Sequence, residues 1–291
     1  MRRDDHTRAL VLLAACGVLW STAGALIKLV DWNVGAIWAT RSAIAAIALW
    51  LIKRPSMRGL SAGEWGAASA LAATTGLFIV ANKLTTAANA ILIQYSAPIW
   101  VALLGAWWLG ERATRLDWAT IAAVLAGIAL FFFDQLTLDH ALGNVVALGS
   151  GVAFALNAMA FRKVAASRDP LRPMLLGNLI GAVLGAPFAI ASFAHGTHVP
   201  DATGWAALLA LGTVQQAAAY LCYAWAIRHA TALEAMLIPV IEPILSPIWV
   251  AIAFGERPGR WAFAGGVIVV GAVTARAVLA RRPSEPPPVH E

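Results

Sequence analysis

The chain has 291 residues, of which 60% are hydrophobic and 12% are charged, whereas soluble domains contain about 25% charged residues. This composition excludes a soluble enzyme and a disordered chain, and the 21 lysines and arginines are scattered rather than gathered on the basic face that nucleic acid would need. The two cysteines, Cys16 and Cys222, both lie in apolar segments, so we expect neither a disulfide framework nor a zinc site.

Apolar segments long enough to cross a membrane follow one another along the chain. A bilayer core about 30 Å thick is crossed by about 20 apolar residues in a helix. Ten such segments are separated by short loops: residues 9–28, 34–52, 65–84, 87–109, 116–133, 143–161, 171–194, 205–227, 233–254 and 260–279. They predict an all-α polytopic membrane protein of ten transmembrane helices. Residues 283–291 are rich in proline and charge, which predicts a disordered cytoplasmic tail.

Basic residues predict the orientation of these helices, because cytoplasmic loops carry more lysine and arginine. With the N-terminus inside, only Lys28, Lys83, Arg257 and Arg260 fall outside, and Arg41 lies within a helix. All other lysines and arginines then lie on the cytoplasmic side. We therefore expect a multi-pass protein of a bacterial inner membrane with both termini in the cytoplasm.

Tryptophans gather at the ends of the segments, as expected for residues that prefer the membrane interface. The inner group comprises Trp50, Trp65, Trp107, Trp108 and Trp118, and the outer group comprises Trp32, Trp205 and Trp261. We interpret both groups as interfacial anchors rather than as ligand-binding residues.

The second half of the chain repeats features of the first. Aligned without gaps, the halves share an apolar pentapeptide, a proline and a Gly-Glu-Arg triplet: residues 89–93 with 234–238, Pro98 with Pro243, and 110–112 with 255–257. A second register aligns residues 17–20 with 151–154 and so pairs Trp20 with Phe154. The glutamates of the two triplets, Glu111 and Glu256, lie at helix ends and are expected to cap or pair locally.

We interpret residues 1–138 and 139–282 as two copies of one five-helix unit. Because five is odd, the second copy is expected to be inverted in the membrane. Inverted repeats of this kind are typical of secondary transporters, whose substrate sites lie near the midplane between the repeats. The chain lacks the phosphate-binding G-x-x-x-x-G-K-[ST] loop, the H-E-x-x-H metal pair and the G-x-S-x-G nucleophile motif. We therefore expect no enzyme activity, no metal and no cofactor.

Several segments resemble a known family. Leu19-Trp20-Ser21 with Lys28, Arg41, AANAILIQYSAPIWVALLGAWWLGER at 87–112 and ALEAMLIPVIEPILSPIWVAIAFGERP at 232–258 resemble the drug/metabolite transporter superfamily, specifically its EamA type. The resemblance covers nearly the whole chain and implies ten helices around a central cavity that moves small metabolites by alternating access. Within the family, the overall sequence is similar to the bacterial aromatic amino acid exporters.

Two charges and two prolines at membrane depth are the first candidates for a substrate site. Pro98 and Pro243 break helical hydrogen bonding at matching positions, which points to the wall of a cavity. Glu242 lies about 15 Å into its helix and Arg41 about 11 Å into its own, at 1.5 Å per residue. Either these two side chains pair with each other, or they bind the ammonium and carboxylate of a zwitterionic substrate. A purely structural role for both is the alternative.

Polar and aromatic residues complete the predicted site. Gln216, Tyr220 and Tyr223 recur at the spacing of one helical face, where they bind substrate or form ordinary interhelical hydrogen bonds. The remaining candidates supply aromatic rings and one amide: Trp20, Tyr95, Phe154 and Asn157.

We therefore expect a secondary transporter that exports small amphipathic metabolites, with aromatic or other neutral amino acids preferred. The alternative is a multidrug or organic-cation efflux transporter, in which Glu242 binds the cation; a channel or lipid scramblase is less favoured. The expected partners are the small-molecule substrate and the lipid bilayer, without nucleic acid, and the oligomeric state stays open, a monomer being plausible.

Overall fold

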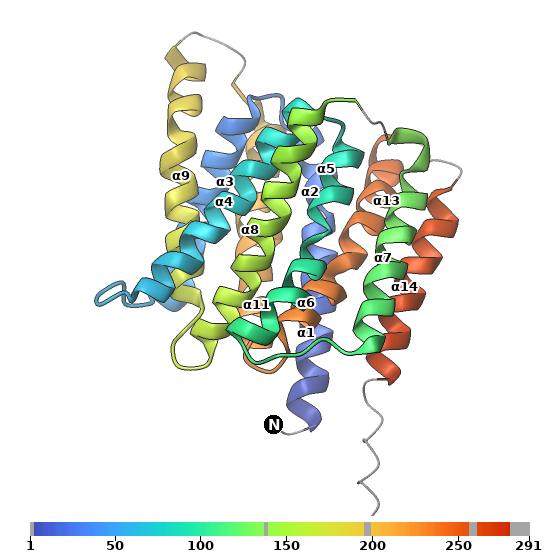
Figure 1. Cartoon of the computed structure of the whole chain (residues 1–291). Helices are drawn as coiled ribbons and strands as arrows, with labels where there is room; N and C mark the ends of the chain where they lie inside the picture. The colour runs from blue at the N-terminus through green and yellow to red at the C-terminus, as the bar shows by residue number, and fades with distance from the viewer. Residues whose placement is uncertain (1–2, 137–138, 195–198, 256–260, 280–291) are drawn as a thin grey trace, which may run out of the picture.

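The computed structural model describes residues 3–136, 139–194, 199–255 and 261–279, and every regular element in these ranges is helical (Figure 1). The predicted all-α fold is confirmed. Glu256 and the tail 283–291, for which the sequence carried expectations, lie outside the described residues.

The helices divide into two halves along the chain. The first half contains α1 (Arg3–Ser21), α2 (Ala23–Lys28), α3 (Val34–Lys53), α4 (Ala62–Leu84), α5 (Ala87–Gln94), α6 (Ala97–Trp108), α7 (Arg115–Phe131) and the 3₁₀ turn η1 (Phe133–Gln135). The second half contains α8 (Ala141–Ala165), α9 (Leu171–Ala194), α10 (Ala202–Ala210), the π-helix η2 (Leu211–Ala218), α11 (Ala219–Ala226), α12 (Ala232–Leu237), the 3₁₀ turn η3 (Ile238–Ile241), α13 (Glu242–Phe254) and α14 (Ala262–Leu279).

Each predicted span corresponds to one helical stretch of the structure. Among the described residues, nine stretches have the length and hydropathy of membrane-crossing helices. The tenth, α7, has 17 residues, which is at the lower limit for a span at 1.5 Å per residue.

Two spans are broken at equivalent places. Pro98 is the second residue of α6, directly after the break from α5, and Pro243 is the second residue of α13, directly after η3. Proline is tolerated in a first turn because the amides there have no partner within the helix. The sequence alignment of these two prolines therefore corresponds to one shared structural position.

The span from α10 to α11 differs from the regular helix expected at 205–227, because η2 inserts π-helical turns into it. Gly212 in η2 lies against α3 so closely that a Cβ there would be 2.5 Å from the Cβ of Ile44. The sequence carries no periodicity signal for such an insertion, since it depends on the neighbouring helix.

The helix contacts follow the repeat. α3 packs against α9 and α7 against α14, while α4 packs against α8 as α1 packs against α11. If each helix is replaced by its equivalent in the other half, the same set of helix–helix contacts results. In Figure 1, α7 and α14 form one side of the bundle, and α3, α4 and α9 form the other.

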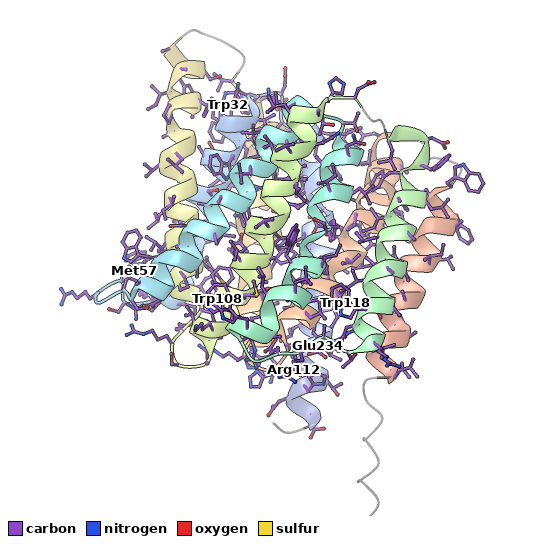
Figure 2. The ribbon with its side chains drawn as sticks, viewed as in Figure 1. Trp32, Met57, Trp108, Arg112, Trp118 and Glu234 are labelled. Atoms are coloured by element: carbon purple, nitrogen blue, oxygen red, sulfur yellow. The ribbon has the colours of Figure 1, made fainter. Side chains whose placement is uncertain are left out.

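Aromatic and charged residues mark the two ends of the bundle. Figure 2 shows Trp108, Arg112, Trp118 and Glu234 at one end and Trp32 at the opposite end. This distribution agrees with the two groups of interfacial tryptophans expected from the sequence.

Candidate functional site

The two helix breaks meet near the centre of the bundle. The hydroxyl of Tyr95, at the end of α5, donates a hydrogen bond to Oε2 of Glu242, the first residue of α13, over 3.1 Å. Tyr95 is buried, whereas Glu242 is partly exposed. A carboxylate at the start of a helix also faces the positive end of the helix dipole. The structure therefore holds the Glu242 carboxylate in place at the start of α13.

Arg41 approaches this carboxylate from α3. Its guanidinium lies within electrostatic range of Glu242 and of the Tyr220 hydroxyl, yet no ion pair within 4.0 Å joins Arg41 to Glu242 in the described part of the chain. The buried Nε of Arg41 has no hydrogen-bond partner. The direct pair weighed from the sequence is thus absent from this conformation, and Arg41 retains a donor for another group.

An amide and hydroxyl chain lies beside Arg41. Nε2 of Gln216, in η2, donates to Oδ1 of Asn178 in α9 over 2.6 Å and lies 3.4 Å from the hydroxyl of Tyr220. All three side chains are buried. Gln216 and Tyr220 thus lie together, on π-helical and α-helical turns, and the Gln216–Asn178 bond is of the interhelical kind given as one alternative from the sequence.

Aromatic rings connect this chain to α1 and α8. The ring of Trp20 is 6.4 Å from that of Tyr220 and 5.8 Å from that of Tyr223, measured between centroids. Phe161 of α8 packs edge-on against Tyr223 at 6.4 Å. Trp20 itself is only partly buried, so the structure brings together a ring surface that a planar apolar group could cover.

The other predicted residues lie close to the α5–α6 break. Pro98 and Pro243 are buried, and Phe154 packs against the apolar cluster that contains Tyr95. No ring contact joins Phe154 to Trp20 among the described residues, so the pair related by sequence does not form one surface. Asn157 is buried one turn further along α8.

Several buried acceptors near these residues have no hydrogen-bond partner: Oδ1 of Asn157, Oε1 of Gln215 and Oε1 of Gln216. Buried polar atoms are nearly always paired in folded proteins. Like Nε of Arg41, these atoms are buried and have unused hydrogen-bonding capacity.

Two features of the structure were not expected from the sequence. Asn178 was not singled out, and no sequence signal distinguishes it, since its role comes from contact with Gln216. The long-range ion pairs at the bundle end that carries Arg112 were not expected either. Glu111 does not act locally as expected there, because it accepts from the backbone nitrogen of Ala232 over 2.8 Å and pairs with Arg162 over 2.9 Å.

The carboxylates of three capping boxes at helix starts also form long-range ion pairs. Glu64 pairs with Arg172 over 3.2 Å and with Arg168 over 3.1 Å. The other two share Arg276, which lies 2.7 Å from Asp117 and 3.4 Å from Glu234. The [ST]-x-x-[DE] motif would have located all three from the sequence.

Both halves of the chain match the same family of known proteins. The sequence profile of the EamA-like transporter family matches residues 7–133 and 141–275. A protein of Archaeoglobus fulgidus described as an uncharacterized transporter is 25% identical over 92% of this chain and 96% of its own length.

Two relatives carry more specific names. A probable terminal-alkyne amino-acid exporter of Streptantibioticus cattleyicolor is 23% identical over 97% of each chain. The pseudopaline exporter CntI of Pseudomonas aeruginosa is 24% identical over 93% of this chain and 96% of its own. A solved crystal structure of another protein covers 96% of this chain and 100% of its own with a TM-score of 0.80 at 20% identity, which shows the shared fold alone.

Proposed function

This chain belongs to the EamA-like transporter family, and from that premise we propose that it is a secondary transporter of the inner membrane that exports aromatic or other neutral amino acids. The membership confirms the family resemblance seen in the sequence. Multi-pass insertion in a membrane and a small-molecule substrate follow from the family and from the apolar spans.

The observation that carries the amino acid proposal is the arrangement of Arg41 and Glu242. Opposite charges lie within electrostatic range without forming an ion pair, and Nε of Arg41 has no partner. A zwitterion satisfies both, since its carboxylate fits the guanidinium and its ammonium fits the Glu242 carboxylate. The rings of Trp20 and Tyr223 lie on the side of Tyr220, where they would contact an aromatic or apolar side chain.

The direction of transport is supported by the relatives. Two of them are described as exporters, one of an amino acid and one of pseudopaline. Their low identity to this chain leaves the substrate as our proposal.

Alternating access is supported by the course of the broken helices. The end of α6 lies beside the start of α12, as the Glu111–Ala232 hydrogen bond requires, and their breaks meet at Tyr95 and Glu242. The two broken spans therefore run antiparallel, as expected for inverted repeats with the substrate at their interface.

Organic-cation efflux is the second candidate. One observation favours it, namely that the carboxylate of Glu242 lies next to the Tyr95 phenol, and an aromatic ring beside a carboxylate suits a quaternary ammonium. In that case Arg41 would contribute nothing to substrate binding.

Transport by purified protein in liposomes separates these functions. We expect saturable counterflow of labelled phenylalanine, and Arg41→Gln is expected to lower its kcat/KM about 10- to 100-fold, the loss of one charged hydrogen bond. Glu242→Gln should have a similar effect. Arg54→Gln, which changes the exposed residue after the end of α3, is the matched control and should transport normally.

A labelled quaternary ammonium in the same liposomes tests the alternative. If Arg41→Gln abolishes phenylalanine transport and spares ammonium transport, two different ligands use the site. Transport of the ammonium with no transport of any neutral amino acid would overturn the amino acid proposal, and unsaturable flux would indicate a channel.

A further inference from the structure

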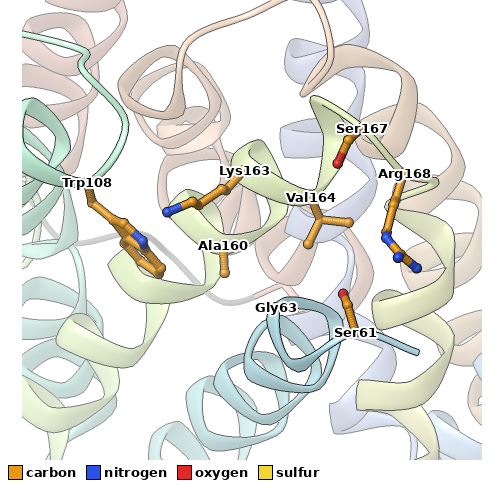
Figure 3. A pocket seen from close by; sticks show the side chains of 8 residues that line it. All are labelled: Ser61, Gly63, Trp108, Ala160, Lys163, Val164, Ser167 and Arg168. Carbon is orange, nitrogen blue, oxygen red and sulfur yellow. The ribbon is translucent and has the colours of Figure 1, made fainter. Parts of the chain in front are cut away.

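A small pocket lies away from the central residues, at the bundle end that carries Trp108. Its volume is about 190 Å³, and it lies between the start of α4 and the last turns of α8 (Figure 3). Its polar lining comes from Ser61, Lys163, Ser167 and Arg168. α4 belongs to the first half of the chain and α8 to the second, so the pocket lies across the junction of the two halves.

The charge around this pocket is positive. Nζ of Lys163 lies 5.5 Å from the centre of the Trp108 ring, and no carboxylate lies within 4.0 Å of Lys163 in the described ranges. Arg168 pairs with Glu64, but Glu64 is shared with Arg172. Two arginines thus share the one carboxylate of Glu64 and Lys163 has no carboxylate partner in those ranges, which leaves an excess of positive charge for an anion.

The pocket also offers the remaining contacts that a lipid headgroup needs. Ser167 is exposed at its rim and carries a hydroxyl donor, while Ala160 and Val164 form an apolar floor. Figure 3 shows Lys163 and Arg168 reaching from α8 and the loop after it toward opposite sides of the space, with Ser61 and Gly63 facing them.

Aromatic side chains place the pocket at the membrane interface. Trp65, in the first turns of α4, is 49% exposed, and Trp107, at the end of α6, is 87% exposed. Exposed tryptophans at helix ends lie at the level of lipid headgroups. Basic pockets between transmembrane helices at this depth suit anionic headgroups.

We propose that this pocket binds the phosphate of an anionic phospholipid, with Lys163 and Arg168 as its cationic ligands and the acyl chains outside the bundle. Lys163, which has no carboxylate partner among the described residues, accounts for the selectivity for anionic over zwitterionic lipids. A choline or ethanolamine headgroup would bring its own cation into a site that is already positive. The bound lipid contacts both halves of the transporter.

Native mass spectrometry of the full chain in detergent tests this assignment with phosphatidylglycerol and phosphatidylcholine of identical acyl chains. The wild type should bind phosphatidylglycerol more tightly, and Lys163→Gln should weaken that binding about fivefold, the worth of one interfacial cation, without changing phosphatidylcholine binding. Lys53→Gln, at an exposed lysine that ends α3 outside the pocket, is the matched control.

Three outcomes of this experiment would overturn the proposal. Equal affinity for the two lipids, or equal loss in Lys163→Gln and Lys53→Gln, would show that the pocket is not a selective lipid site. Displacement of phosphatidylglycerol by an equimolar amount of glycerol phosphate would instead assign the pocket to a soluble phosphate. Unchanged melting temperatures of both variants exclude misfolding as the cause of a loss.

Discussion

Gly127 and Gly265 let two helices cross with their backbones in contact. A Cβ at Gly265, in α14, would lie 2.5 Å from the backbone nitrogen of Phe131 in α7, and a Cβ at Gly127 would lie 2.7 Å from the side chain of Val269. Small residues allow such crossings in membranes, where close packing replaces the hydrophobic driving force. The close contact between α7 and α14 therefore depends on the absence of a side chain at these two positions.

Gly265→Ala should destabilise the protein, because the obstructing atoms belong to backbone and cannot rotate away. We expect a loss of about 1–3 kcal/mol, typical of an overpacked interior. Gly271→Ala changes another glycine of α14 whose Cβ would meet no atom within 4 Å, and it should be neutral. Thermal unfolding of both variants in detergent measures the difference, and equal melting temperatures would contradict the backbone contact between α7 and α14.

At the start of each of the helices α4, α7 and α12, one carboxylate has two roles. In each capping box a carboxylate accepts from the backbone amide of the N-cap residue, and the same carboxylate binds an arginine from elsewhere in the chain. Arg276 of α14 is the most buried of these arginines and joins Asp117 to Glu234. Helix initiation and tertiary assembly therefore depend on the same side chains.

Arg276→Met should be strongly destabilising, since it removes the arginine shared by two buried carboxylates and leaves Glu234 with His6 alone as an ion-pair partner among the described residues. A loss of about 3–5 kcal/mol is expected for a broken buried pair. Arg228→Met, which removes an exposed pair with Asp169, should cost at most about 1 kcal/mol. Melting of both variants checks the contrast, and adding Asp117→Asn and Glu234→Gln to Arg276→Met should restore much of the loss.

Across the whole molecule, ion pairs link the two halves at one end of the bundle. Glu111 pairs with Arg162, and Asp117 pairs with Arg276, each bridging the first half to the second. The same end carries Arg112 and Trp108 in Figure 2. If the proposed alternating access opens the bundle at this end, these pairs must break.

The first loops of the two halves should lie on opposite sides of the membrane if the second half is inverted. In a variant with Cys16 and Cys222 replaced by alanine, an impermeant maleimide applied to intact cells should label Asp31→Cys and not Ala166→Cys, both of which are exposed positions. Permeabilised cells should label both. Labelling of both variants in intact cells would refute the inversion.

Much of the candidate site follows from the sequence, for reasons that differ by residue. Arg41 and Glu242 stand out because charges at membrane depth are rare and costly. Pro98 and Pro243 stand out because the repeat aligns them. Asn178 and the long-range partners of Glu111 could not be found, because nothing in their own sequence neighbourhood differs from ordinary helix packing.

The sequence by itself determined that this chain crosses a membrane as two related sets of helices, because apolar length and repeated motifs are local properties of the chain. Only the tertiary structure decided that Tyr95 holds Glu242, that Arg41 keeps a donor without a partner, and that a basic pocket lies between the halves. These features depend on which helices pack side by side. Which helices pack together depends on contacts between residues that are far apart in the chain. No local sequence pattern specifies such contacts.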